Sequence, residues 1–220
     1  MAIFKRNLTS EILEEESLKV ISHFGSSISI LEIGCGNGNI THNLIKKFPR
    51  NKYHASDISE ESISYAKKLD VNNSIDFRVS SGIDSWIDKK FDIVICDISA
   101  ISEIIADLSD WYDGVSCKTG ISGLDIVNPV IKNVKNILTN NSFFIIPVIS
   151  LCNVTLQKKS LCKTFFSVQY SKERKWPLPK DLLYKMEEKS IKLDSDFLDV
   201  ESKFDMVIAS TCAAICHNNN

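Results

Sequence analysis

Apolar and polar residues follow two different spacing patterns along this chain. In residues 10–24, apolar side chains at Leu13, Val20, Ile21 and Phe24 alternate with acidic ones, which predicts an amphipathic helix. Elsewhere, short unbroken apolar runs predict buried strands, and the run 91–98 predicts a central strand covered on both faces. The predicted strands are 28–33, 53–58, 75–79, 91–98, 143–150, 167–171 and 206–211. The predicted helices are 10–24, 39–47, 60–69, 102–107, 124–138, 155–165 and 181–189, with Ser59 as an N-cap.

The order of these elements predicts the fold class. Strands alternate with helices along most of the chain, which is typical of an α/β protein with a doubly wound, mostly parallel sheet of seven strands. We expect one domain over residues 1–220, in which residues 1–25 form an N-terminal helical segment that caps the core.

The amino-acid composition limits the partners, metal sites and cellular location that we expect for this chain. The 220 residues are 44% hydrophobic and 25% charged, and the net charge of −2 gives no sign of a nucleic acid partner, although a local basic patch would leave one open. The longest apolar runs, such as 143–149, are too short to span a membrane, so we expect no membrane partner. The oligomeric state is left open. The seven cysteines form no Cys-x-x-Cys pair and predict free thiols in a reducing cytoplasm, without a metal site. The N-terminus lacks the apolar run of a signal peptide, so we expect a cytoplasmic protein.

A glycine-rich turn follows the first predicted strand. It has the pattern acidic-x-Gly-x-Gly-x-Gly, with Glu32 at the strand end and glycines at 34, 36 and 38. Glycines at alternate positions allow a tight bend and let a ligand approach the backbone at the start of a helix. A dinucleotide-binding turn would need its third glycine at the position of Asn39. Asp57 stands 19 residues after Gly38, at the end of the second strand, where a carboxylate can accept hydrogen bonds from both hydroxyls of a ribose.

This combination resembles the first motif of the class I methyltransferases that use S-adenosyl-L-methionine (SAM) and release S-adenosyl-L-homocysteine (SAH). The resemblance implies a Rossmann-like sheet whose last strand is antiparallel. It also implies that Glu32 anchors the methionine end of SAM, that Asp57 holds the ribose, and that Ile58 packs on the adenine. The turn after the third strand would lie at the adenine edge, although it is equally well explained as an ordinary turn. The implied cofactor-binding residues are Glu32, Gly34, Cys35, Gly36, Asn37, Gly38, Asp57, Ile58, Ser81, Gly82, Ile83 and Asp97.

The end of the fourth predicted strand is where we expect the methyl acceptor, because ligands of open α/β sheets bind at the carboxyl ends of the strands. Asp97 is the candidate catalytic residue, and Ser99 could hydrogen-bond the acceptor. Trp111 and Tyr112, in the loop 110–113, could form an aromatic wall, and Trp176 could do similar work. The alternatives are a packing role for the two loop aromatics and a strand-end cap for Asp97.

A narrower resemblance concerns the acceptor. The segment 119–127, with Gly-Leu-Asp at 123–125, and the segment 5–11 are similar to release-factor glutamine methyltransferases. Those enzymes carry Asn-Pro-Pro-Tyr after the fourth strand, whereas this chain keeps only an acidic residue, Asp97, without proline or aromatic in the next three positions. Without that motif, this chain lacks the residues that hold a planar amide nitrogen in those enzymes. We therefore expect methyl transfer to N or O of a small-molecule acceptor. The alternatives are a protein methyltransferase acting on glutamine or another side chain, and a non-catalytic SAM-binding partner protein. A dinucleotide-dependent dehydrogenase is a further hypothesis, although Asn39 interrupts the glycine pattern that it requires.

Overall fold

A nine-stranded sheet lies at the centre of the computed structural model, which describes residues 7–112 and 117–219. The strands are β1 (Ser29–Ile33), β2 (Lys52–Asp57), β3 (Ile75–Val79), β4 (Phe91–Cys96), β5 (Leu138–Ile149), β6 (Ser167–Tyr170), β7 (Arg174–Pro177), β8 (Glu201–Lys203) and β9 (Met206–Asn218). The α-helices are α1 (Leu8–Phe24), α2 (Asn39–Lys47), α3 (Glu60–Leu69), α4 (Glu103–Leu108), α5 (Val127–Asn133), α6 (Val154–Thr164) and α7 (Lys180–Glu188). Short 3-10 turns are η1 (Asp84–Trp86), η2 (Asp110–Tyr112) and η3 (Val134–Ile137). Within the described ranges, no helix has the length and apolar content needed to cross a membrane.

The main path of the sheet confirms the predicted fold class. Its order is β3-β2-β1-β4-β5-β9-β6, and the pairs from β3 through β5 are all parallel. The last strand, β9, runs antiparallel to both β5 and β6. These seven strands form the doubly wound sheet that the alternating elements predicted, with the antiparallel last strand that the family resemblance implied.

Several boundaries differ from the prediction. The helix predicted over 124–138 ends earlier, because α5 gives way to η3 and Leu138 already begins β5. The last strand continues seven residues beyond Thr211 to Asn218, since it pairs with β5 over its carboxyl half and with β7 and β8 near its start. Strands β7 and β8 carry charged residues and were not predicted, because only pairing with β9 makes them strands.

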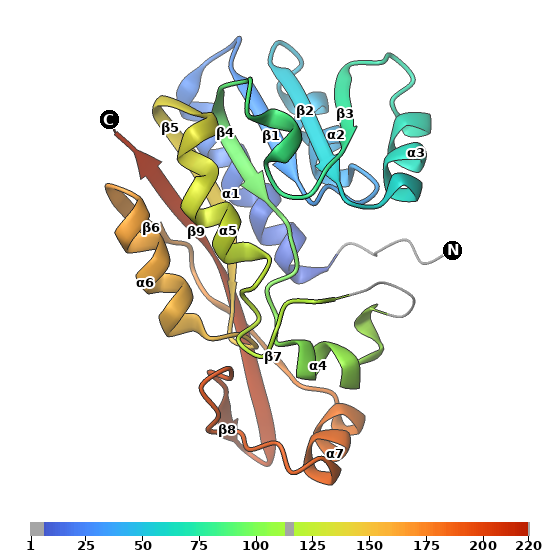
Figure 1. The fold of residues 1–220 in the computed structure, drawn as a ribbon, viewed down its shortest axis with the longest axis vertical. Coiled ribbons are helices and arrows are strands. Elements are labelled where there is room, and N and C mark those ends of the chain that lie inside the picture. Colours follow the sequence, from blue (N-terminus) through green and yellow to red (C-terminus); the bar gives the residue numbers. More distant parts are fainter. Residues whose placement is uncertain (1–6, 113–116, 220) are drawn as a thin grey trace.

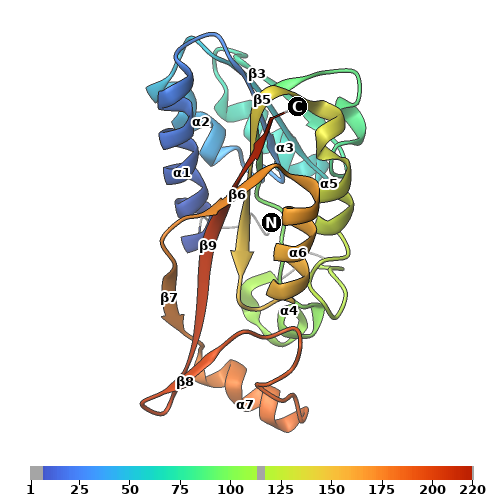
Figure 2. The same cartoon turned by 90° about the vertical axis from the view of Figure 1, so that its left-hand side faces the viewer.

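Helices cover the two faces of the sheet (Figure 2). The core on one face includes Leu13 of α1, Leu44 of α2 and Ala66 of α3. The core on the other face contains Trp86 of η1 together with apolar residues of α5, η3 and α6. The side chain of Ser59 accepts a hydrogen bond from the Ser62 N–H, which confirms the predicted N-cap of α3. Burial on both faces explains why the central strands read as nearly continuous apolar runs.

A third apolar cluster lies beyond the carboxyl ends of the parallel strands, where Figure 1 shows α4 and α7 beside the lower part of β9. Ile105 of α4, Leu182 of α7 and Ala209 of β9 are fully or almost fully buried in it. We refer to it as the acceptor-side lobe. Its residues come from the segment after β4, the end of β5, the stretch between β6 and β9, and β9 itself. The lobe thus lies beyond the same edge of the sheet at which the parallel strands end.

Candidate functional site

Three carboxyl groups meet at the carboxyl ends of neighbouring strands. Glu32 lies in β1, Asp57 ends β2, and Asp97 follows β4, whose backbone N–H at Asp97 donates to the Ile33 carbonyl at 2.8 Å. Burial, together with the charges of Asp97 and Asp57, raises the pKa of Glu32 to about 8. Burial and the charge of Asp57 raise the pKa of Asp97 to about 7. The charges of Asp97 and Asp57 thus disfavour the ionisation of Glu32, and the charge of Asp57 disfavours the ionisation of Asp97.

Glu32 is only 1% exposed and joins the first strand to the helix after the turn. Its Oε2 accepts a hydrogen bond from the Thr41 N–H at 3.0 Å and a second from the Thr41 hydroxyl. These contacts satisfy an N–H in the first turn of α2, where no intrahelical acceptor is available. The predicted anchor residue is thus held by α2 from one side.

The three glycines of the turn have different roles. A side chain at Gly34 would meet the Asp97 carbonyl oxygen at 2.9 Å, and one at Gly38 would meet the His42 ring at 3.3 Å. Both positions therefore need glycine for packing. Gly36 has φ of +51° and nothing within 4 Å of the place where a Cβ would be. The open space beside Gly36 is a cradle that a ligand could fill without meeting a side chain.

Asp57 is oriented toward this cradle by two backbone donors. Its Oδ2 accepts from the Gly36 N–H and its Oδ1 from the Ser59 N–H, both at 2.9 Å. Each carboxylate oxygen keeps further acceptor capacity for a hydroxyl of a ligand. The neighbouring Ile58 side chain is 75% exposed, which leaves an apolar surface next to the carboxylate. A ribose with an attached flat base would suit this pair.

The remaining predicted cofactor residues differ in exposure and in their contacts. Ser81 is exposed, Gly82 lies against Val130, and Ile83 is buried in the core, so the side chain of Ile83 faces away from solvent. The Asn37 side chain accepts from the Asn39 N–H at 3.2 Å and thereby supports the turn. Burial raises the pKa of the Cys35 thiol well above its usual range.

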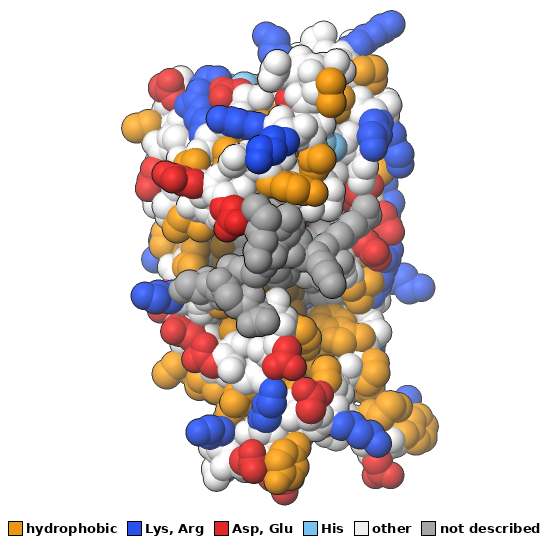
Figure 3. Space-filling view, turned by 90° about the vertical axis from the view of Figure 1, so that its right-hand side faces the viewer, with side chains coloured by type: hydrophobic (Ala, Val, Ile, Leu, Met, Phe, Trp, Pro, Cys, Tyr) orange, Lys and Arg blue, Asp and Glu red, His pale blue; other side chains and the backbone are white. Residues whose placement is uncertain are grey.

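The predicted acceptor residues gather into a polar group beside Asp97. The Ser99 Oγ lies 2.7 Å from the Tyr112 hydroxyl and 3.3 Å from the Cys117 Sγ. Burial raises the pKa of Tyr112, and the charge of Asp97 adds to this shift. Trp111 is 38% exposed on the same 3-10 turn. Asp113 of the predicted loop and residues 5 and 6 of the predicted segment lie outside the described residues and are grey in Figure 3.

Trp176, the third aromatic residue of the acceptor prediction, packs against the apolar cluster of the acceptor-side lobe, as do Tyr112 and Cys117. Two residues with contacts to the predicted site were missed from the sequence. Cys117 touches Ser99, and the Ser10 hydroxyl donates to Asp97 Oδ2 at 2.7 Å. The spacing of 87 residues between Ser10 and Asp97 offers no local signal for this contact.

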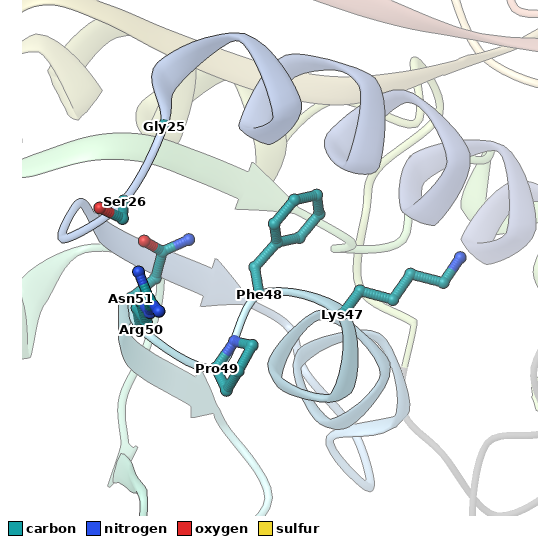
Figure 4. A pocket seen from close by; sticks show the side chains of 7 residues that line it. All are labelled: Gly25, Ser26, Lys47, Phe48, Pro49, Arg50 and Asn51. Atoms are coloured by element: carbon teal, nitrogen blue, oxygen red, sulfur yellow. The ribbon is translucent and has the colours of Figure 1, made fainter.

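A surface hollow of about 210 Å³ lies at the opposite, amino edge of the sheet (Figure 4). It is lined by Gly25, Ser26, Lys47, Phe48, Pro49, Arg50 and Asn51. Lys47 and Arg50 lie near the carboxyl ends of α1 and α2, where cations complement the helix dipoles. This hollow is therefore separate from the three carboxyl groups. Among the described residues, no group of three or more His, Cys, Asp or Glu is arranged to hold a metal ion.

Comparison with known protein families gives a match over most of the chain. A family model described as a methyltransferase domain matches residues 24–190. The bifunctional methyltransferase of Rickettsia typhi is 25% identical over 174 residues, which cover 75% of this chain and 32% of that protein. The release factor glutamine methyltransferase of Koribacter versatilis is 29% identical over 129 residues, covering 54% of this chain and 45% of that protein. The chain thus spans less than half the length of these relatives.

Solved structures share the fold. The N-methyltransferase NodS of Bradyrhizobium japonicum, solved in complex with SAH, superposes with a TM-score of 0.55. The superposition covers 99% of this chain and 91% of that chain at 12% sequence identity. At this level of identity, the likeness concerns the arrangement of the sheet and helices.

Proposed function

The chain belongs to the class I methyltransferases, whose cofactor is SAM, and we propose that it methylates a nitrogen or oxygen of a small molecule held beside Asp97. The observation that supports this acceptor class most directly is the position of Asp97. Its partly buried carboxyl group lies at the end of β4, within the electrostatic influence of Tyr112, which contacts Ser99. A proton acceptor and two hydroxyls thus lie close together after the end of β4.

The residues around the glycine turn fit SAM. The open space at Gly36 leaves room for it, Asp57 offers acceptors for the ribose hydroxyls, and the exposed Ile58 offers an apolar face for the adenine. When bound, SAM supplies an electrophilic methyl group.

Asp97 is the proton acceptor in this proposal. An N–H or O–H acceptor group forms a bond to the methyl carbon as the methyl–sulfur bond breaks, and the bonding pair leaves with the sulfur. The proton of the acceptor passes to Asp97, whose pKa of about 7 suits transfer near neutral pH. Ser99 and Tyr112 orient the acceptor by hydrogen bonds, and the neighbouring lobe excludes water.

Methylation of a release-factor-like glutamine is the second candidate. It is favoured by the similarity to the release factor glutamine methyltransferase of Koribacter versatilis. The loop 119–125, which carries part of the resemblance, has a structural role in this chain. A side chain at Gly123 would come within 2.7 Å of Cys152 Cβ and of the backbone at Ile101, while the Gly120 N–H donates to Glu103. These glycines support the start of α4, so their presence carries little information about the acceptor.

The proposal is tested by calorimetric titration with SAM and SAH, followed by measurement of SAH release over a panel of small amines, phenols and carboxylates. Glutamine-containing release-factor peptides form a second panel. We expect SAM binding and turnover with a small molecule. Turnover only with the peptides would favour the second candidate. Binding without turnover in both panels would favour a non-catalytic SAM-binding protein, and absence of SAM binding would exclude all three functions.

Asp97→Asn tests the role of the carboxyl group, and Asp107→Asn is the matched control. Asp107 is exposed on α4, so its substitution removes the same charge from the acceptor-side lobe without touching Asp97. We expect turnover to fall only in Asp97→Asn. An equal effect of both substitutions would mean that general electrostatics, and not a proton acceptor at Asp97, governs the reaction.

A further inference from the structure

Ser10 makes a long-range contact to the carboxyl group at the centre of the site. Its hydroxyl donates to Asp97 Oδ2 at 2.7 Å, and Ser10 itself is only 5% exposed. The Asn7 Oδ1 lies farther from the same hydroxyl, at 3.3 Å, and it also accepts from the Ser10 N–H at 3.0 Å. Because a hydroxyl has one proton, the shorter contact assigns that proton to Asp97.

The first turn of α1 is held firmly in this place. Asn7 caps the helix, and the side chains of Ile12 and Leu13 are buried in the core. The Asn43 side chain of α2 donates to Glu14, and Arg174 of β7 pairs with Glu15. Figure 1 shows α1 running from the carboxyl edge of the sheet, where the acids meet, to the amino edge. The positive end of a 17-residue helix therefore lies beside the Asp97 carboxyl group.

The other titratable groups around Asp97 oppose its negative charge. Glu32 reaches it from β1 and Asp57 from β2, and both are carboxyl groups. Tyr112 faces it from η2, and the thiols of Cys35 and Cys96 lie within its electrostatic influence. Within residues 7–112 and 117–219, the groups that favour the Asp97 anion are thus the Ser10 hydroxyl and the end of α1.

We propose that Ser10 is a positioning residue, which fixes the Asp97 carboxylate by occupying Oδ2 and leaves Oδ1 to take the proton of the methyl acceptor. This inference rests on the proposed function of Asp97. It adds α1 to the active site, besides the role of this helix in packing against the hydrophobic core. Loss of the Ser10 hydroxyl should make Asp97 a harder group to ionise and should leave the SAM cradle at Gly36 and Asp57 intact.

The experiment compares Ser10→Ala with Ser10→Thr, which retains the hydroxyl, and with Ser17→Ala as a matched control. Ser17 is fully buried two turns along the same helix, and its hydroxyl has no hydrogen-bond partner among the described residues. Protein labelled with ¹³C at the aspartate carboxyl groups is titrated by NMR, and the Asp97 signal is assigned by its loss in Asp97→Asn. This readout needs no methyl acceptor.

We expect Ser10→Ala to raise the midpoint of the Asp97 titration by about one pH unit, since a hydrogen bond to the charged form is lost. Ser10→Thr and Ser17→Ala should titrate like the wild type. An unchanged midpoint in Ser10→Ala, or an equal shift in Ser17→Ala, would overturn the proposal. If Ser10→Ala does not fold, Ser10→Cys replaces it, because a thiol is a weaker donor of similar size and should give a smaller shift in the same direction.

Calorimetry with SAH separates this proposal from the proposed function. We expect the dissociation constant of SAH to stay within about twofold in Ser10→Ala, because the hydroxyl acts on Asp97 and not on the cradle. If the wild-type protein does not bind SAH, the proposed function is refuted, although the titration of Asp97 can still be measured. A shifted titration together with a large loss of SAH affinity would show that Ser10 serves the cofactor, and would overturn its positioning role.

Discussion

Glutamine in place of Glu32 should stabilise this protein at alkaline pH. Glu32 is buried against Thr41, and its pKa rises from 4.5 to about 8 in the folded chain. Between these values the folded state keeps a proton that the unfolded state has lost. The free energy of unfolding therefore falls as the pH rises from about 4.5 to about 8, and it stays low above that range. Glutamine has no proton to lose, and its carbonyl oxygen can still accept from the Thr41 N–H and hydroxyl.

The size of the effect follows from the pKa difference. Each pKa unit corresponds to about 1.4 kcal/mol, so the shift of Glu32 from 4.5 to about 8 sets an upper bound of about 5 kcal/mol. Part of this cost comes from the charges of Asp97 and Asp57, which can relax when one of them takes up a proton. We therefore expect Glu32→Gln to gain about 2–5 kcal/mol over the wild type near pH 8.5 and almost nothing near pH 5.

Urea unfolding of both proteins without SAM, at several pH values between about 5 and 8.5, measures this difference. Glu60→Gln serves as the control, since Glu60 is an exposed carboxylate in the first turn of α3. Its stability should follow that of the wild type at every pH, apart from a small constant offset. Parallel curves for Glu32→Gln and the wild type would mean that Glu32 is already ionised at neutral pH, and would refute the reasoning from burial.

Three further predictions concern the site and its support. Asp97→Asn should lower turnover at least about 100-fold while leaving SAH affinity within about twofold, as measured by steady-state kinetics and calorimetry; an equal loss of affinity would assign Asp97 to cofactor binding instead. Gly36→Ala should weaken SAM binding at least about tenfold, because its Cβ would enter the open cradle. Gly25→Ala, also at positive φ and with nothing within 4 Å, should cost only stability, about 1 kcal/mol; similar SAM affinities for both variants would contradict the cradle. Trp86→Phe should lower the free energy of unfolding in urea by about 1–3 kcal/mol, because the buried Ser56 hydroxyl loses its 3.0 Å contact to the indole N–H. An unchanged free energy of unfolding would show that water replaces this hydrogen bond.

The prediction of the fold succeeded where the signals were local. The apolar run 91–98 became β4 because both of its faces are covered, and the glycines after Glu32 became the predicted turn because their positive φ angles need no distant partner. The prediction failed where hydrogen-bonded pairing with a distant strand determined the structure against the local propensity of the residues. Strand β7, with Arg174 and Lys175, is a strand because β9 extends far enough to pair with it. The segment 134–138 continued an apolar helical pattern, yet it forms the 3-10 turn η3 and its last residue, Leu138, already pairs with β4 as the start of β5.

For the site, the sequence by itself determined which acids end the strands, because the parallel sheet carries Glu32, Asp57 and Asp97 to one edge wherever the alternation of strands and helices holds. Only the tertiary structure decided how those acids behave. The burial of Glu32 depends on Thr41 nine residues away, and the partner of Asp97 comes from a helix 87 residues earlier in the chain. Ionisation depends on solvent exclusion and on charges within a few ångströms, and these are set by packing between distant segments.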